Sequence, residues 1–495
     1  MITLYNTLTK IKERLIPRHP STSSGQAKIQ MFVCGPTVYD YIHIGNARTF
    51  VFFDVVAKYL RSHIRTGVLS TSSLNAQSQR YEVDYIQNIT DIDDKIIARA
   101  KESNREPIEY AKEYYEKFKE DMKALGVDSP RYILATEHIE QVVKQVKTLI
   151  DKGHAYLIEG DGYYFDLSTF KDYGKLSGRK AQMADDAVSR IDENDKKKNK
   201  GDFCLWKLSK EGEPAWDFET GKMARAAFGN NGRPGWHIED TAITEHFFGP
   251  QYDIHGGGQD LIFPHHEAEI TQQESASGLK PFVKYWMHVA FLINKDQKMS
   301  KSVGNFETVN ELLKKYPKEV LRFYLLSGYY RQPLEFSDKM LKQSEAAIQR
   351  ISEFTRKLKN LKNVATSQVN TSEKIDKYIA ESKKSFNQAM DNDFNTPEAF
   401  AVLFELIRKV NPIVTTSQVV TSKILDFLTK VNKILGIIPV EQQKIPGEAQ
   451  ELVEKREKFR EEKNYEEADK IRTQIQDLGY EVEDTIYGPL VSKNN

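Results

Sequence analysis

The sequence predicts an α/β domain built on a parallel sheet, followed by an α-helical bundle and a small C-terminal module. Two apolar runs near the N-terminus, KIQMFV at 28–33 and YEVDYIQNI at 81–89, have the length and pattern of strands. Each run is followed by residues at helical spacing, and this alternation is typical of a parallel sheet covered by helices. Beyond about residue 335 the apolar residues recur at helical spacing, which predicts the bundle.

The first strand is expected to end at Cys34, and the helix that follows it to begin near Ala47. The second strand ends before Thr90, and the next helix begins within TDIDDKIIARAKES. Ligands of parallel sheets bind at the carboxyl ends of the strands. Cys34 and Thr90 both fall at such an end, so they are candidates for a ligand site.

The domain boundaries follow from changes in pattern. The sheet-based domain is expected to span 1–335, with an insertion of mixed pattern at about 135–235. The lysine-rich stretch DENDKKKNKGD inside this insertion is expected to be a solvated loop, with RNA contact as the alternative. The helical bundle is expected at 336–440, and a helical pair with a short β element at 441–495.

Composition restricts the class of protein. The chain has 495 residues, of which 39% are hydrophobic and 29% charged, as in globular proteins that do not span a membrane. No apolar run is long enough to cross a bilayer, and the N-terminus lacks the apolar core of a secretory signal, so we expect a cytoplasmic protein. Two cysteines, Cys34 and Cys204, are too few for a disulfide framework. The 71 basic residues balance the 71 acidic ones, so a nucleic acid would have to bind local basic patches.

Two short motifs indicate a nucleotide. His43-Ile44-Gly45-Asn46 stands at the start of the first helix, where free backbone N–H groups and the helix dipole attract phosphate. Lys298-Met299-Ser300-Lys301-Ser302 lies far downstream, before a helix capped by Thr308 and Glu311. Alone, the first motif is explained by chance and the second by a surface turn. Together and in this order, the two motifs predict a nucleotide site.

The pair of motifs resembles the two signatures of class I aminoacyl-tRNA synthetases. The stretches CGPTVYD, NITDIDDK, GRPGWHIE, DIHGGGQDLIFPHHEAE and YWMH are similar to those of the cysteinyl-tRNA synthetase family in particular. The resemblance implies a Rossmann-type catalytic domain that joins cysteine to ATP, releasing pyrophosphate, and transfers the cysteinyl group from the adenylate to the 3′ end of tRNA(Cys). It also implies Mg-ATP as a substrate and one zinc ion in each chain. We further expect a monomer and no binding to membranes, although the sequence itself does not give the oligomeric state.

The resemblance assigns roles to residues that match the family motifs. The residues that act on the phosphates would be His43, Asn46, Lys298 and Lys301, the last two in the loop 298–302. The adenosine would lie against Gly257, where glycine allows close approach, and Asp260. The cysteine pocket would be formed by Gly35, Thr90, Trp236 and His255. The alternative for Trp236 is a core aromatic residue.

A metal site is also expected. His265 and Glu269 are four residues apart in FPHHEAEI, so both side chains face one way on a helix. Such a pair is by itself more often a surface pair than a metal site. Cys34 at a strand end changes this balance, because imidazole, carboxylate and thiolate together suit zinc. Zinc sites of this family hold the substrate sulfur, and a zinc ion would reject serine, whose hydroxyl binds it poorly.

The chain departs from the family at two points. The family usually has a second cysteine ligand in GWHIEC, whereas this chain reads GWHIED, with Asp240. The hypothesis is that zinc is bound by Cys34, Asp240, His265 and Glu269; the alternative is that Asp240 points elsewhere and water completes the site. Cys204 is expected to be a core residue. Relatives often carry a tryptophan near the C-terminus, and YGPLVSKNN has none, so the mode of anticodon reading is not assigned.

Two other functions compete with this assignment. ATP-dependent ligases that join cysteine to an amino sugar share the pocket, but they end after the catalytic domain, whereas this chain continues beyond 335. An inactive relative that only binds RNA is the other alternative. Intact His43, Asn46, Lys298 and Lys301 argue against it. Cysteine-dependent exchange of pyrophosphate into ATP would distinguish an active enzyme from such an inactive relative.

Overall fold

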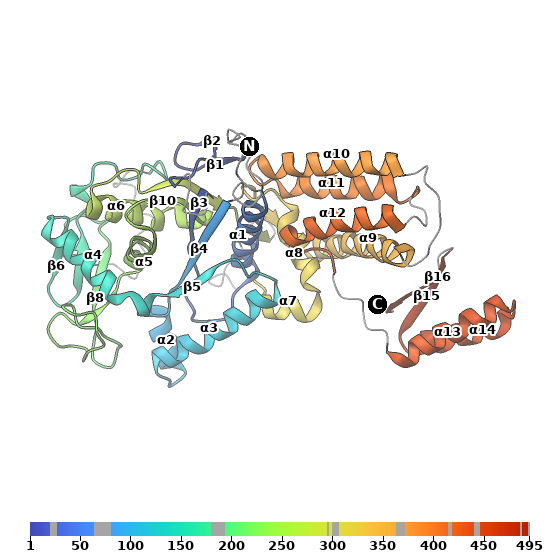
Figure 1. The fold of residues 1–495 in the computed structure, drawn as a ribbon. Coiled ribbons are helices and arrows are strands. Elements are labelled where there is room, and N and C mark those ends of the chain that lie inside the picture. Colours follow the sequence, from blue (N-terminus) through green and yellow to red (C-terminus); the bar gives the residue numbers. More distant parts are fainter. Residues whose placement is uncertain are drawn as a thin grey trace. The chain divides into compact units, whose positions relative to one another are not determined.

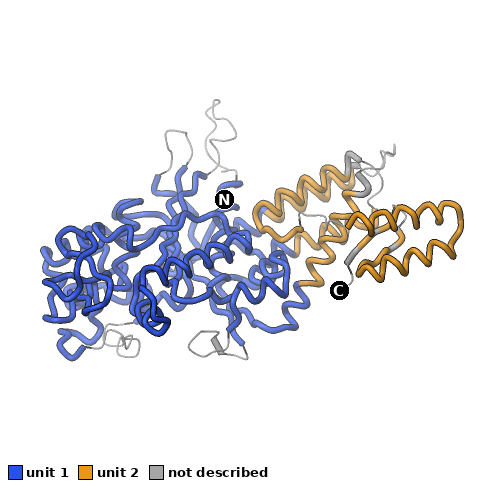
Figure 2. Tube along the Cα trace, turned by 90° about the horizontal axis from the view of Figure 1, so that it is seen from below, with its two compact units in different colours: residues 1–344, 387–400 blue, residues 345–386, 401–495 orange. Residues whose placement is uncertain are grey.

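The computed structural model describes most of the chain, namely residues 1–19, 27–63, 81–179, 194–294, 297–298, 306–362, 372–413, 418–439, 446–485 and 488–493. Two compact units are distinguished in Figure 2. The first comprises 1–344 and 387–400, and the second comprises 345–386 and 401–495.

A five-stranded parallel sheet forms the centre of the first unit. Its strands, in spatial order, are β11 (Val283–Val289), β10 (Tyr252–Gly258), β3 (Ala27–Val33), β4 (Tyr81–Ile89) and β5 (Arg131–Leu134). Met31 of β3 lies between Ile254 of β10 and Tyr85 of β4. Both strands predicted from the sequence are present, and the predicted α/β class with a parallel sheet is confirmed.

Helices cover the sheet on both sides. Figure 1 shows α1 (Ile44–Ser62) on one side and α5 (Ile238–Phe248) and α6 (His265–Ser277) on the other. α1 begins one turn before the predicted start at Ala47. The reason is a cap: His43 Nδ1 accepts a hydrogen bond from the backbone N–H of Gly45 at 3.1 Å, which satisfies a donor of the first turn. α2 (Asp94–Glu102) and α3 (Pro107–Ala124) follow β4.

A second, antiparallel sheet lies between β5 and α5 in the chain. After a 3₁₀ turn and α4 (Ile139–Asp151), its four strands pair in sequence order, and they are β6 (Ala155–Ile158), β7 (Gly162–Phe165), β8 (Cys204–Leu208) and β9 (Gly232–Pro234). Cys204 is 3% exposed and packs with Ile158 and Tyr164. The prediction that Cys204 is a core residue is therefore confirmed.

Short elements complete the first unit. A hairpin of β1 (Thr3–Asn6) and β2 (Ile11–Arg14) precedes the sheet. Beyond β11, a small sheet joins β12 (Leu292–Asn294) to β13 (Gln297–Lys298) on one side and β14 (Leu334–Glu335) on the other. α7 (Val309–Lys315) and α8 (Lys318–Ser327) lie between β13 and β14 in the chain. Thr308 and Glu311 form the predicted capping box of α7.

The C-terminal part is helical, as its spacing predicts. Its long helices are α9 (Asp338–Lys362), α10 (Ser372–Asp391), α11 (Thr396–Val410) and α12 (Gln418–Leu435). The chain ends with a helical pair and a two-stranded hairpin: α13 (Gly447–Glu461), α14 (Tyr465–Asp477), β15 (Tyr480–Thr485) and β16 (Gly488–Lys493). Val453, Ile471, Ile475 and Val482 give these last elements an apolar core of their own. Among the described helices, none combines the length and the apolar composition that spanning a membrane requires.

Candidate functional site

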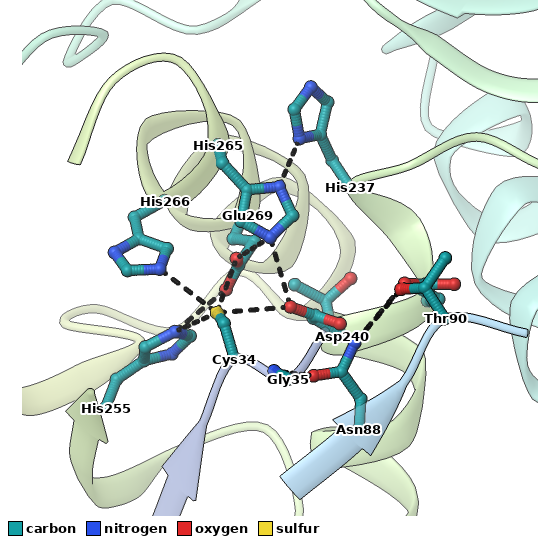
Figure 3. Close-up of polar contacts among 12 residues, drawn as sticks. Cys34, Gly35, Asn88, Thr90, His237, Asp240, His255, His265, His266 and Glu269 are labelled. Carbon is teal, nitrogen blue, oxygen red and sulfur yellow. Dashed lines mark hydrogen bonds and ion pairs between the residues drawn. The ribbon is translucent and has the colours of Figure 1, made fainter. Parts of the chain in front are cut away.

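Four predicted metal ligands converge at the carboxyl end of the central sheet. Cys34 directly follows β3, and its backbone N–H donates to the carbonyl of Gly256 in β10 at 3.0 Å. Asp240 lies in the first turn of α5, while His265 and Glu269 lie one turn apart on α6. All four side chains are buried and point toward one another, as Figure 3 shows.

The distances among these four residues suit a tetrahedral ion. His265 Nε2 lies 3.1 Å from Asp240 Oδ2 and 3.0 Å from Glu269 Oε1. Cys34 Sγ lies 3.3 Å from Asp240 Oδ2 and 3.8 Å from Glu269 Oε1. A tetrahedral zinc ion with its usual bond lengths separates neighbouring ligand atoms by about 3.3 to 3.5 Å. The donors therefore need only small shifts to bind one ion.

Among the residues that the structure describes, two buried oxygen atoms of the cluster have no hydrogen-bond partner. They are Oδ1 of Asp240 and Oε2 of Glu269, in side chains that are at most 1% exposed. The latter oxygen lies 3.5 Å from Nε2 of His255, a neutral ring. A buried carboxylate oxygen without a partner is unfavourable, and crowding it with a second acid and a thiol makes it more so. A divalent cation would compensate both oxygens. The residues present therefore fit a bound metal.

Two further histidines face the same thiol. Nε2 of His255, in β10, lies 3.2 Å from Cys34 Sγ, and Nε2 of His266, in α6, lies 3.1 Å from it. These two histidines, with Cys34 and Glu269, form a second group whose donor atoms lie within reach of one ion. His266 is not among the ligands predicted from the sequence. The only signal for it was its place beside His265 in FPHHEAE.

Hydrogen bonds outside the cluster orient the histidine rings. Nδ1 of His265 lies 2.7 Å from Nδ1 of His237, and Nδ1 of His266 lies 2.8 Å from Nε2 of His288. Nδ1 of His255 lies 2.6 Å from the hydroxyl of Tyr252. In each ring the other nitrogen, Nε2, is thereby directed at the cluster, which is the usual arrangement around metal-binding histidines.

Burial favours the neutral forms of several side chains in and around the cluster as long as no cation is bound. Burial raises the pKa of the Cys34 thiol well above its usual range, and the carboxylates of Glu269 and Asp240 raise it further. Burial, with Asp240 beside it, also raises the pKa of Glu269. Burial lowers the pKa values of His255 and His266, so both rings are neutral. A dication reverses the effect on the acids because it stabilises thiolate and carboxylate.

The predicted cysteine-pocket residues surround the same cluster. The backbone N–H of Gly35 donates to Asn88 Oδ1 at 2.6 Å, and the Thr90 hydroxyl donates to Glu239 Oε1. A Cβ at position 35 would lie 1.6 Å from the Asn88 carbonyl oxygen, so only glycine fits there. Trp236, 41% exposed, stacks on the ring of His265 with centroids 4.5 Å apart. Its predicted core alternative is therefore wrong.

The predicted phosphate-binding residues lie at the N-terminus of α1. His43 is the N-cap, and Asn46 lies in the first turn. The chain that follows residue 305 returns to this point: the backbone N–H of Ile44 donates to the carbonyl of Glu307 at 3.0 Å, and His43 pairs with Thr308. Residues 299–305, with Lys301, lie outside the described residues, and of Lys298 only the backbone is described, in β13.

The predicted adenosine residues lie at the end of β10. Gly257 packs so closely that an added Cβ would lie 2.8 Å from Cε1 of His266. Asp260 follows in a 3₁₀ turn, Gln259–Ile262. Gly257 is thus on the strand that also carries His255, next to β3, and Asp260 follows shortly after the end of that strand.

A buried arginine ties α1 to the small sheet. Arg48 is 1% exposed, and its guanidinium donates to four backbone carbonyls. Two of them, Ala290 and Phe291 at 2.8 and 3.0 Å, directly precede β12, and two, Tyr329 and Gln332 at 3.2 and 2.9 Å, precede β14. Arg48 thus fixes the sheet that contains the backbone of residue 298 against the helix that His43 caps.

The chain matches three protein-family models in succession. The model described as "tRNA synthetases class I (C) catalytic domain" covers residues 20–346. The model described as "DALR domain" covers 385–439, and that described as "Cysteinyl-tRNA ligase anticodon binding domain" covers 442–486.

Curated proteins resemble the chain over almost its whole length. A cysteine–tRNA ligase of Carboxydothermus hydrogenoformans is 42% identical, over 98% of both chains. One of Clostridioides difficile is 41% identical over 98% of both chains. One of Thermococcus onnurineus is 40% identical over 99% of this chain and 98% of its own.

Solved structures share the fold at low identity. Methionyl-tRNA synthetase of Mycobacterium tuberculosis, in complex with methionyl-adenylate, superposes with a TM-score of 0.58 at 13% identity, covering 83% of this chain and 92% of its own. A LeuRS–tRNA–LeuAMS complex of Agrobacterium radiobacter K84 also gives 0.58, at 10% identity and 84% coverage of both chains. The predicted class I synthetase fold is confirmed.

Proposed function

The chain belongs to the cysteine–tRNA ligase family of class I aminoacyl-tRNA synthetases, and from this premise we propose that it activates cysteine with Mg-ATP and transfers the cysteinyl group from the adenylate to the 3′ end of tRNA(Cys). The observation that supports this most directly is the buried cluster of Cys34, Asp240, His265 and Glu269 beside the predicted cysteine pocket. Two of these residues are thiol and imidazole, which select a soft metal, and a soft metal selects a sulfur-containing substrate.

The metal of this proposal is zinc, one ion in each chain, held by those four residues. Bound zinc supplies a Lewis acid that binds a thiolate far better than a neutral hydroxyl. The ligands have the same formal charge as in a site with a second cysteine, because the carboxylate of Asp240 replaces a thiolate. Asp240 is the harder donor, so it makes the ion a stronger Lewis acid and holds it less tightly.

The alternative ligand group, with His255 and His266, is less favourable. If that group held the ion, Asp240 would remain buried 3.3 Å from the thiolate of Cys34, with Oδ1 unpaired. A buried carboxylate oxygen without a hydrogen-bond partner is unfavourable. With Asp240 as a ligand, His255 and His266 keep their own partners, Tyr252 and His288. Their Nε2–H groups then donate to the sulfur of Cys34.

The phosphates would be held at the start of α1. Because Nδ1 of His43 accepts from Gly45, the ring proton is on Nε2, which is the nitrogen that would donate to a phosphate oxygen. Asn46 adds an amide donor in the same turn, where the helix dipole favours negative charge. Lys298 and Lys301 would stabilise the charge that builds on the phosphates as pyrophosphate leaves. Gly257 and Asp260 would receive the adenosine.

The residues after 335 would serve tRNA. We assign residues 1–335 to catalysis, 336–440 to contact with the tRNA body, and 441–495 to the anticodon region. The match of 442–486 to an anticodon-binding model supports the last assignment. We propose that the protein acts as a monomer, in the cytoplasm with its tRNA.

The test is cysteine-dependent exchange of labelled pyrophosphate into ATP, with serine as the control amino acid. The proposal predicts exchange with cysteine, little with serine, and charging of tRNA(Cys) when tRNA is added. Charging of an amino sugar in place of tRNA would instead identify a cysteine–sugar ligase. Absence of any cysteine-dependent exchange would contradict the assignment.

A further inference from the structure

Four residues next to the metal cluster form a hydrogen-bond chain in which the first donor fixes the orientation of the Asn88 amide. The backbone N–H of Gly35 donates at 2.6 Å to Asn88, so the atom that Asn88 turns toward Gly35 is its carbonyl oxygen. The amide nitrogen of Asn88 then faces the other way and donates to Glu239 Oε1 at 3.3 Å. The hydroxyl of Thr90 donates to the same oxygen. Figure 3 shows Asn88 between Gly35 and Thr90.

The bond to the Glu239 carboxylate decides what Thr90 can offer a substrate. A hydroxyl has one proton and two lone pairs, and when Glu239 is a carboxylate the proton of Thr90 is used on it. At most one lone pair is used by Asn88, whose Nδ2 lies 3.5 Å from Oγ1. Thr90 therefore presents an acceptor, and its natural partner is a positively charged donor.

The backbone holds Thr90 firmly in this position. Its N–H donates to the carbonyl of Pro36, and its carbonyl accepts from the N–H of Val38, both at 3.1 Å. The carboxyl end of β4 is thereby joined by hydrogen bonds to the loop that follows Cys34. The Thr90 hydroxyl is thus held beside the loop that carries the metal-binding thiol.

Glu239 places a carboxylate behind that hydroxyl. Glu239 is 2% exposed and directly precedes Asp240 in the first turn of α5. None of the ion pairs found among the described residues includes Glu239, although burial of an uncompensated carboxylate is unfavourable. A substrate cation near Thr90 would compensate it. Among the groups of free cysteine, only the α-ammonium is a cation.

We propose that Glu239 is a positioning residue that turns the Thr90 hydroxyl into an acceptor for the α-ammonium group of cysteine. Asn88 supports this role because it holds the Glu239 carboxylate in place from the Gly35 side. The inference rests on the proposed function, since it assigns one end of the substrate of that site. The pocket would then recognise cysteine at two points, its sulfur at the metal and its ammonium at Thr90.

The test uses 3-mercaptopropionate, which is cysteine without the amino group. The affinity of each protein for cysteine is measured in pyrophosphate exchange, and that for 3-mercaptopropionate as a competitive inhibitor of the exchange. The quantity compared is the preference for cysteine, the ratio of the two affinities. Glu239→Gln should lower this preference on the order of tenfold or more, the effect of losing a charge-assisted hydrogen bond. Zinc content is measured for every variant.

Substitutions at Thr90 provide an independent test. Thr90→Val should lower the preference as Glu239→Gln does, Thr90→Ser should retain it, and the double variant should lose little more than either single one. Glu267→Gln is the matched control: Glu267 is 1% exposed on α6 and accepts from the backbone N–H groups of Leu176 and Ser177. The Glu267→Gln variant should keep the wild-type preference for cysteine over 3-mercaptopropionate.

Three outcomes would overturn the inference. If Glu239→Gln lowered the affinities for cysteine and for 3-mercaptopropionate equally, Glu239 would have only a structural role. A Thr90→Val variant with an unchanged preference would remove Thr90 from ammonium recognition, even if Glu239→Gln failed to fold. A wild-type enzyme that exchanges pyrophosphate but shows no preference would mean that the ammonium is not recognised, while the proposed function would stand. Only loss of wild-type exchange would contradict the proposed function itself.

Discussion

The sulfur of Cys34 and the Oδ2 atom of Asp240 lie 3.3 Å apart in the buried site, although 206 positions separate the two residues in the chain. The contact joins the end of β3 to the first turn of α5. Asp240 stands where the family resemblance leads one to expect a second cysteine. A thiolate and a carboxylate have the same charge but differ in softness, so this pair sets the character of the proposed metal site.

Lys301→Ala should lower kcat of adenylate formation by about a hundredfold or more and raise KM for ATP far less. The reason is that the lysine acts mainly when charge develops on the phosphates. His43→Ala should behave in the same way, because both residues act on the same transition state. Lys314→Ala, on the exposed face of α7, is the control and should leave both constants unchanged. An unaltered kcat in Lys301→Ala would remove the loop from the mechanism.

Removal of residues 441–495 should leave cysteine-dependent pyrophosphate exchange nearly intact and weaken charging of tRNA(Cys). The last elements have an apolar core of their own, formed by Val453, Ile471, Ile475 and Val482, so their loss need not disturb the first unit. Pyrophosphate exchange and tRNA charging are measured on the same preparation. Collapse of the exchange would show that these residues are part of the catalytic fold, and the assigned boundary would be wrong.

Arg48→Ala should lower kcat of adenylate formation at least tenfold while leaving zinc content unchanged. It removes four hydrogen bonds that fix β12 and β14 against α1. Arg322→Ala is the matched control, because Arg322 is also 1% exposed and bonds to Asp54 of α1 and to the carbonyls of Leu125 and Gly126.

Both arginine variants should be destabilised by roughly 3 kcal/mol, since each leaves buried acceptors unpaired. Only Arg48→Ala should show the additional loss of kcat, measured at a temperature where both variants are folded. Equal losses of kcat in the two variants would mean that Arg48 is only a structural residue. Arg48→Lys should recover part of the stability but little of the geometry, because a lysine cannot reach four carbonyls.

The sequence was sufficient for features that depend on local pattern. The two strands, the capping box at Thr308 and Glu311, and the core position of Cys204 all follow from spacing and residue type. The start of α1 was predicted one turn late because apolar spacing does not register a cap made by a histidine, here His43.

Features that depend on tertiary contact were not visible. Asn88 and Glu239 look like ordinary polar residues in the sequence, and only the packing of β4 against α5 joins them. The orienting partners His237 and His288 are likewise remote from the rings that they contact, by 28 and 22 positions. Family resemblance named the ligands of the metal, whereas the geometry added the unpaired oxygens of Asp240 and Glu269.

The affinity for zinc should increase when residue 240 supplies a softer donor atom. Asp240→Cys should hold zinc more tightly than the wild-type chain in competition with a chelator, because a second thiolate replaces the harder carboxylate. The measurement is the chelator concentration that removes half of the metal. Weaker retention by Asp240→Cys would contradict the softness argument, although Asp240 could still be a ligand.

The zinc content of the purified protein and of its variants, with cobalt substitution as a second readout, tests the proposed metal site directly. We expect one zinc ion in each wild-type chain, loss of most of it in Asp240→Ala and His265→Gln, and retention in His266→Gln. The cobalt form should show thiolate-to-metal absorption that becomes stronger in Asp240→Cys, because a second sulfur then binds the metal. Full zinc content and undiminished rejection of serine in Asp240→Ala would show that Asp240 is not a ligand, and a wild-type chain without zinc would contradict the recognition of cysteine through its sulfur.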